Sequence, residues 1–121
     1  AAEINDAYHV LKSPISRAEY LLALHDVDIR AEQQTMSDPE FLMTQMELRE
    51  ALSELADAQD PEVELFDFSN KVDVMYQQQH QELAQKLEQH QWQDAADDVR
   101  KLKFIEKLQK EIELLEDKLL G

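Results

Sequence analysis

The single glycine of this chain, Gly121, stands at its last position, and only three prolines occur among its 121 residues. Strands joined by hairpins depend on turn residues such as glycine and proline, and few are present here. Alanine, leucine, glutamate, glutamine and lysine are abundant, and these residues favour helices. The sequence therefore predicts an all-α protein.

The three prolines also predict where the helices begin. Ile4, Ala7, Tyr8 and Leu11 recur at helical spacing until Pro14 interrupts that run. Two later Asp-Pro pairs each place an N-cap acid before a proline at the first helical position. The elements expected are a short helix over residues 17–25, an irregular connection over 26–37, and helices over 39–58, 61–89 and 92–121.

Apolar residues follow each of the three long helices at spacings of three and four. The stripe of the first helix is Phe41, Leu48, Leu52, Leu55 and Ala56, with Gln45 among them. That of the second is Leu65, Phe68, Val72, Met75, Leu83 and Leu87. That of the third is Trp92, Ala96, Val99, Leu102, Ile105, Leu108, Ile112, Leu115 and Leu119. Such stripes joined by short connections indicate an elongated antiparallel three-helix bundle with a small helical piece in front.

The charge of the chain limits its partners. Twenty-seven acidic and 12 basic residues give a net charge of -15. Such a surface repels phosphate groups, so neither nucleic acid nor an anionic membrane is expected as a partner, and basic proteins fit better. The alternative is that the acid only aids solubility. The chain has no cysteine and no apolar run near the roughly 20 residues of a membrane span, which is compatible with a cytoplasmic location.

The sequence shows no pattern typical of an enzyme or a metal site. It lacks a Glu-x-x-His pair, a His-Glu-x-x-His run and a glycine-rich phosphate loop. Its histidines, at positions 9, 25, 80 and 90, are never three or four residues apart, so surface or capping roles are expected for them. Asp97 and Asp98 are adjacent and predict a solvated face. We expect no catalytic residue, no metal and no cofactor.

The helix over residues 39–58 carries more apolar surface than one core can bury. If Phe41 is placed at 0°, then Leu42, Met43 and Met46 lie about 100° to 200° away from the core stripe. Glutamates border this second group on its outer side. An exposed apolar group rimmed by charge predicts a binding surface, where methionines suit an adaptable contact. The alternative is that the leading helical piece covers it.

Phe104 raises the same question on the last helix. It points to one side of Leu102 and Ile105, and it follows the densest basic cluster of the chain, at Arg100, Lys101 and Lys103. A phenylalanine in this setting could contact a partner at the rim, or it could widen the buried stripe.

Three separated segments resemble the HscB family of J-type co-chaperones, in the same order and spacing. The first resembles the end of a J domain: Ile4-Asn5-Asp6-Ala7-Tyr8, Leu11, Pro14, and Ser16-Arg17-Ala18-Glu19-Tyr20-Leu21-Leu22. The second is Phe41-Leu42-Met43 with Glu47-Leu48-Arg49-Glu50. The third runs from Trp92 to Phe104 and includes Ala95-Ala96 and Val99-Arg100-Lys101-Leu102. The resemblance spans nearly the whole chain.

The resemblance implies a function in iron–sulfur cluster assembly. HscB-like proteins bind the IscU-type scaffold protein and deliver it to a specialised DnaK-like ATPase of the HscA type, whose ATP hydrolysis they stimulate through the J domain. By the same resemblance, the scaffold-binding residues are Leu42, Met43, Met46, Glu47, Glu50, Glu54 and Phe104. The family has leucine where this chain has Met46, which preserves the apolar volume.

The chain departs from the family in one respect. Stimulation uses a His-Pro-Asp loop, and these 121 residues contain none. The expected organisation is the tail of a truncated J domain over residues 1–25, a connecting loop over 26–37, and a scaffold-binding three-helix domain over 38–121. A free-standing helical interaction module or assembly subunit is the second hypothesis, and an unrecognised enzyme or metal-binding bundle is the third.

Overall fold

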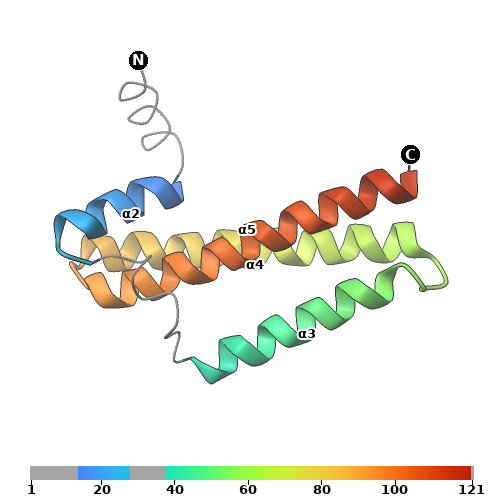
Figure 1. The fold of residues 1–121 in the computed structure, drawn as a ribbon, viewed down its shortest axis with the longest axis horizontal. Helices are drawn as coiled ribbons and strands as arrows, with labels where there is room; N and C mark the ends of the chain where they lie inside the picture. The colour runs from blue at the N-terminus through green and yellow to red at the C-terminus, as the bar shows by residue number, and fades with distance from the viewer. Residues whose placement is uncertain (1–13, 28–37, 121) are drawn as a thin grey trace, which may run out of the picture. The chain divides into compact units, whose positions relative to one another are not determined.

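The computed structural model describes residues 14–27 and 38–120, and all its regular elements there are helices (Figure 1). They are α2 (Pro14–Leu24), α3 (Pro39–Leu55), α4 (Pro61–Glu88) and α5 (Trp92–Leu120). The expected all-α class is confirmed. The helical run predicted from Ile4 to Leu11, and most of the predicted connection, lie outside the described residues. None of the described helices has a stretch long and apolar enough to cross a membrane.

The predicted helix starts are confirmed at both Asp-Pro pairs. Asp38 is the N-cap of α3, and its Oδ1 accepts a hydrogen bond from the backbone amide of Phe41 at 3.2 Å. Pro39 occupies the first turn, where a missing amide proton leaves no bond unmade. Helix α4 likewise begins at Pro61.

Helices α2 and α4 end in the same way without a glycine. Asp26 and His90 adopt left-handed backbone angles, with φ of 62° and 58°. Aspartate and histidine are among the non-glycine residues most often found there. The amide one residue further on then donates to a carbonyl five residues back, which closes each helix. These bonds run from Val27 N to Leu22 O, 2.8 Å, and from Gln91 N to Lys86 O, 2.9 Å.

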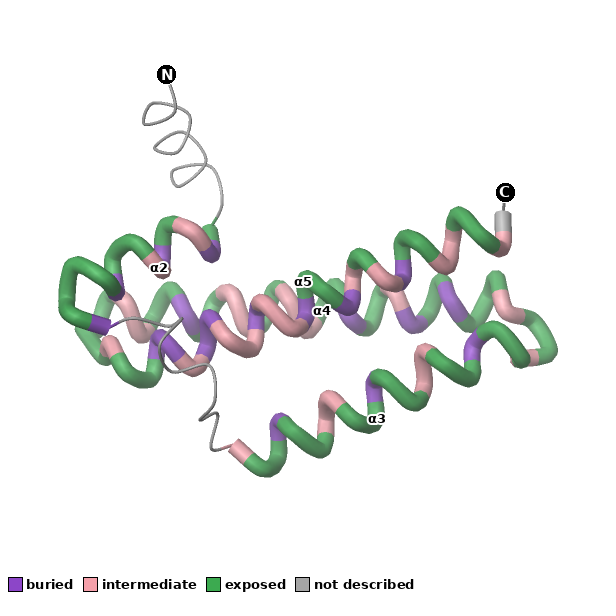
Figure 2. The backbone as a smooth tube through the Cα atoms, in the orientation of Figure 1, coloured by how far each residue is buried: buried purple, intermediate pink, exposed green. Residues whose placement is uncertain are grey.

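The chain forms two compact units. The first comprises residues 1–36 and 79–103, and the second comprises residues 37–78 and 104–121. Helices α4 and α5 therefore each contribute one part to the first unit and another part to the second. Figure 2 shows buried positions recurring as separate bands along these helices.

The second unit is a three-helix bundle around one apolar core. Helix α3 packs there with the first part of α4 and the last part of α5, through Leu48, Leu55, Leu65, Phe68, Val72, Ile105, Leu108 and Ile112. All eight belong to the predicted stripes. Ala56 does not, because α3 ends at Leu55 and Ala56 is its exposed C-cap, where helical spacing no longer applies.

The first unit packs α2 against the end of α4 and the start of α5. Ile15, Ala18 and Leu22 are the buried residues of α2. Lys103 of α5 forms an ion pair with Glu19 at 3.2 Å. Trp92 stacks on His25, with ring centroids 3.9 Å apart, and on His90 at 5.1 Å. These two histidines are thus exposed residues that contact the single tryptophan of the chain.

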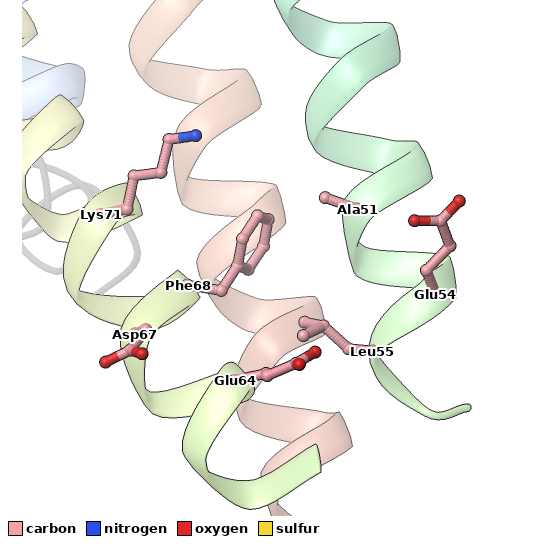
Figure 3. Close-up of a pocket in the computed structure, with 7 residues that line it drawn as sticks. All are labelled: Ala51, Glu54, Leu55, Glu64, Asp67, Phe68 and Lys71. Atoms are coloured by element: carbon pink, nitrogen blue, oxygen red, sulfur yellow. The ribbon is translucent and has the colours of Figure 1, made fainter. Parts of the chain in front are cut away.

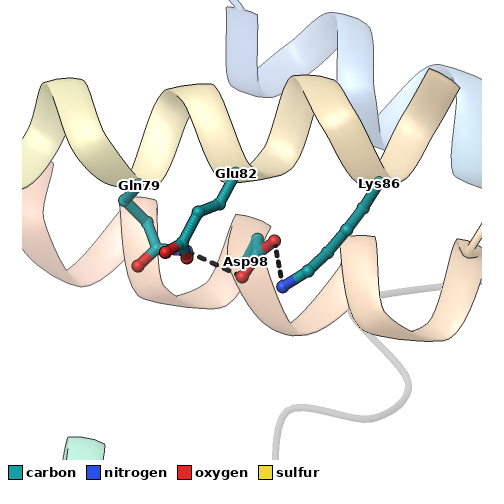
Figure 4. A network of polar contacts seen from close by, with 4 residues as sticks. All are labelled: Gln79, Glu82, Lys86 and Asp98. Carbon is teal, nitrogen blue, oxygen red and sulfur yellow. Dashed lines mark hydrogen bonds and ion pairs between the residues drawn. The ribbon is translucent and has the colours of Figure 1, made fainter. Parts of the chain in front are cut away.

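Asp98 corrects the prediction of a solvated acidic face. Its side chain has no exposed surface, whereas its neighbour Asp97 is half exposed and pairs with Arg100 at 2.6 Å. Adjacent residues are 100° apart on a helix, so only one of the two can share the buried side with Val99. Asp98 receives a hydrogen bond from Gln79 at 2.7 Å and pairs with Lys86 at 2.7 Å (Figure 4).

Candidate functional site

Three neighbouring apolar side chains of α3 are exposed to solvent. Leu42, Met43 and Met46 retain 45%, 62% and 73% of their accessible surface. Phe41 and Leu48 are buried on the side of α3 that faces the core. The residues that helical spacing places away from the core are therefore at the surface, and we call Leu42, Met43 and Met46 the apolar patch.

Three exposed glutamates, Glu47, Glu50 and Glu54, lie on the same helix beyond the patch. With Phe41 at 0°, they fall between 180° and 240° at 100° per residue. Met43 shares that range, so the glutamates and the methionine lie along one strip of α3. The apolar patch thus has acid along the edge that is turned away from the core.

Glu54 also lines an open groove between α3 and α4 in the second unit (Figure 3). Phe68 and Leu55 form its apolar floor, and further acidic side chains stand beside them. The remaining lining residues are Ala51, Glu64, Asp67 and Lys71. The acidic edge of the patch therefore continues around α3 onto α4.

Phe104 of α5 is half-buried and packs against the core of the second unit. Its ring meets the ring of Phe41 edge to face, with centroids 5.8 Å apart and planes at 85°. Edge-to-face contact is a preferred geometry for aromatic pairs. Phe104 therefore widens the buried stripe and differs in this from the exposed patch residues.

Arg49 brings Phe104 and α3 together, and our sequence analysis did not single it out. Its guanidinium carbon lies 5.5 Å from the centre of the Phe104 ring. Its Nη1 also forms an ion pair with Glu111 of α5 at 2.6 Å. The spacing could have identified it, because Leu42, Met46 and Arg49 follow one another at four and three residues and share one strip of α3.

Other apolar residues are exposed on the outer side of α4. Val63, Phe66 and Val74 retain more than half of their surface. They lie opposite the core residues of that helix at 100° per residue, so the same wheel argument could have found them. They span 12 positions, however, whereas the apolar patch gathers three residues within five. Local density, not exposure by itself, distinguishes the patch.

The site holds the groups of a protein-contact surface. Among residues 14–27 and 38–120, no group of three or more histidine, aspartate or glutamate side chains could hold a metal ion. Apolar side chains that stay in water have a desolvation cost that a covering partner removes. The seven residues named from the sequence all lie in the second unit; their role in binding stays a prediction.

Comparison with known proteins gives both a family and close relatives. Residues 37–113 match the family described as the HSCB C-terminal oligomerisation domain. A protein of Vibrio atlanticus named "Co-chaperone protein HscB homolog" is 64% identical over all 121 residues, which cover 71% of that protein. A protein of the same name from Photobacterium profundum is 60% identical over 117 residues, which make up 97% of this chain and 68% of the relative.

Two solved structures share the fold. The chaperone HscB from Vibrio cholerae matches with a TM-score of 0.87 and 49% identity, over 98% of this chain and 69% of the other. The Jac1 co-chaperone from Saccharomyces cerevisiae matches with a TM-score of 0.78 and 26% identity, over 93% of this chain and 74% of the other. The helical arrangement is therefore shared with co-chaperones of a bacterium and a yeast.

Proposed function

The chain belongs to the HscB family of co-chaperones, and from that premise we propose that it binds the IscU-type scaffold protein of iron–sulfur cluster assembly. In the complete protein, the scaffold is delivered to an HscA-type DnaK-like ATPase in the cytoplasm. The single observation that carries the proposal is the exposed apolar patch of α3. Its three residues match the scaffold-contact positions that the resemblance implies.

The apolar patch supplies most of the binding energy in this proposal. Interfaces concentrate their energy in a few well-covered side chains, and truncation of each costs about 1 to 4 kcal/mol. Two of the three patch residues are methionines, whose unbranched side chains adapt to a partner surface. The half-buried Phe104 adds a rigid aromatic edge beside them.

The acidic edge of the patch selects the partner. Glu47, Glu50 and Glu54 are exposed, and their carboxylates attract a basic surface through water before contact. Charges at the rim of an interface change the association rate and its salt dependence more than the final affinity. We therefore assign these glutamates to steering and orientation.

Organisation along the chain follows the same proposal. Residues 1–25 are the tail of a J domain, residues 26–37 connect, and residues 38–121 bind the scaffold. Delivery and stimulation belong to different parts, because stimulation requires a His-Pro-Asp loop that these 121 residues do not contain. The chain should bind the scaffold without raising the ATPase rate.

The test combines a pull-down with a steady-state ATPase assay. Immobilised chain should retain purified IscU-type scaffold, and the HscA-type ATPase with scaffold should stay at its basal rate when the chain is added. A version extended upstream by a J-domain segment with His-Pro-Asp should raise that rate. Failure to retain the scaffold contradicts the binding role, and stimulation by the chain alone contradicts the division of labour.

A further inference from the structure

Arg49 is exposed on the same strip of α3 as the patch residues Leu42 and Met46, yet its side chain turns toward α5. The guanidinium carbon lies 5.5 Å from the centre of the Phe104 ring, within the distance at which a cation is attracted to an aromatic face. The Phe104 ring is therefore held by two neighbours, Arg49 over its face and Phe41 in edge-to-face contact.

Glu111 holds the other end of this arrangement. Its Oε2 accepts a hydrogen bond from Arg49 Nη1 at 2.6 Å. The side chains of Arg49 and Glu111 are 41% and 33% exposed, and ion pairs in such surroundings add little to stability. The pair does, however, fix the direction of a planar guanidinium, which a flexible lysine ammonium could not do.

We propose that Arg49 is a positioning residue of the binding surface: held by Glu111, its guanidinium fixes the Phe104 ring in the orientation that meets the scaffold. This inference rests on the proposed function. A side chain that is already ordered before binding loses less conformational freedom in the complex, which raises affinity without a new contact. Arg49 thus acts through Phe104.

The charge of Arg49 allows a sharp test, because positioning and simple electrostatics predict opposite results. If Arg49 acted only as a charge, Arg49→Gln would make an acidic surface more acidic and would strengthen the attraction to a basic scaffold. Positioning predicts weaker binding, by about 3- to 10-fold. Arg49→Lys keeps the charge but loses the planar group, so it should bind as weakly as Arg49→Gln.

The first measurement is calorimetric titration of the scaffold into wild-type chain, Arg49→Gln, Arg49→Lys and Glu111→Gln. The matched control is Lys107→Gln, which makes the same charge change at an exposed position of α5. The control should bind as wild type does. Wild-type affinity of Arg49→Lys would overturn the inference while leaving the proposed function intact.

The second measurement does not need the scaffold. The chain has four phenylalanines, so selective carbon-13 labelling gives few ring signals, which single Phe→Leu variants can assign. Arg49→Gln and Glu111→Gln should shift the Phe104 ring signals and leave those of Phe66 unchanged. Unshifted Phe104 signals would overturn the inference. If the wild-type chain does not bind the scaffold, the proposed function fails, and these signals still decide whether Arg49 holds Phe104.

Discussion

The carboxylate of Asp98 lies 2.7 Å from the ammonium of Lys86, and no part of the Asp98 side chain reaches solvent. Burial raises the pKa of Asp98 above its ordinary value, because the pull of Lys86 does not fully offset desolvation. Desolvation also opposes the charge of Lys86, but the hydrogen bond and attraction from Asp98 outweigh it, so the pKa of Lys86 is raised as well. The pair therefore stabilises the charge of its lysine and disfavours that of its aspartate.

This asymmetry predicts unequal effects of removing either partner. The Lys86 side chain is 29% exposed and can turn to water, whereas Asp98 cannot. Lys86→Met should lower the free energy of unfolding by about 3 kcal/mol, because it leaves a buried carboxylate without its cation. Asp98→Asn should lower it by about 1 kcal/mol, since the amide oxygen can still accept from Gln79. Urea denaturation measures both.

The control for this comparison is Lys71→Met, a change of the same kind at an exposed position of α4. It should stay within about 0.5 kcal/mol of wild type. Equal losses for Lys86→Met and Lys71→Met would show that the buried pair has no special role in stability.

The raised pKa of Asp98 also predicts a pH dependence with a definite sign. Between its folded value and the ordinary value of 3.8, the folded protein binds more protons at Asp98 than the unfolded chain does. The free energy of unfolding contributed by this group therefore rises as the pH falls through that window, and it is constant above it. Asn at position 98 cannot titrate.

The measurement is the difference in unfolding free energy between wild type and Asp98→Asn. From neutral pH down to 3.8, this difference should change in favour of wild type. The subtraction removes the contribution of carboxylates elsewhere in the chain. A change in favour of the variant would mean that Lys86 lowers the pKa of Asp98 more than burial raises it.

Charge reversal at Glu50 tests the steering role of the acidic edge. Glu50→Lys should slow association with the scaffold by about 2- to 10-fold at low salt and should make the rate less sensitive to salt. Stopped-flow measurements over a salt series give both quantities. Glu113→Lys, an equal change at an exposed position of α5, serves as the control. Equal slowing by the two variants would point to net charge and against a local role for Glu50.

Much of this fold is readable from the sequence for identifiable reasons. The Asp-Pro pairs give the starts of α3 and α4, because an N-cap acid and a proline in the first turn act locally. The apolar stripes give the core of the second unit, because helical spacing determines which side chains share a face. The exposed patch follows from the same geometry, as the residues left over on α3.

The rest depends on contacts between helices, which spacing within one helix does not specify. Asp98 looks like part of an acidic surface until Lys86 and Gln79 are brought to it from α4. His90 ends α4 in a conformation for which glycine is the usual signal. Phe104 could be buried or exposed on its own helix, and its half-buried position is set by Phe41 and Arg49 across the bundle.

The most direct test of the account is calorimetric titration of the IscU-type scaffold into the variant Leu42→Ala/Met43→Ala/Met46→Ala, with a melting curve on the same sample. The control is Val63→Ala/Phe66→Ala/Val74→Ala, which removes exposed apolar residues from α4.

The account predicts that the α3 variant loses scaffold binding, by about 100-fold or more, while the α4 variant binds as wild type does. Each exposed substitution should change the free energy of unfolding by only about 0.5 kcal/mol, and alanine favours the helix, so the melting temperature of the α3 variant should stay close to wild type. Scaffold binding that survives in the α3 variant, with its fold intact, would contradict the central claim.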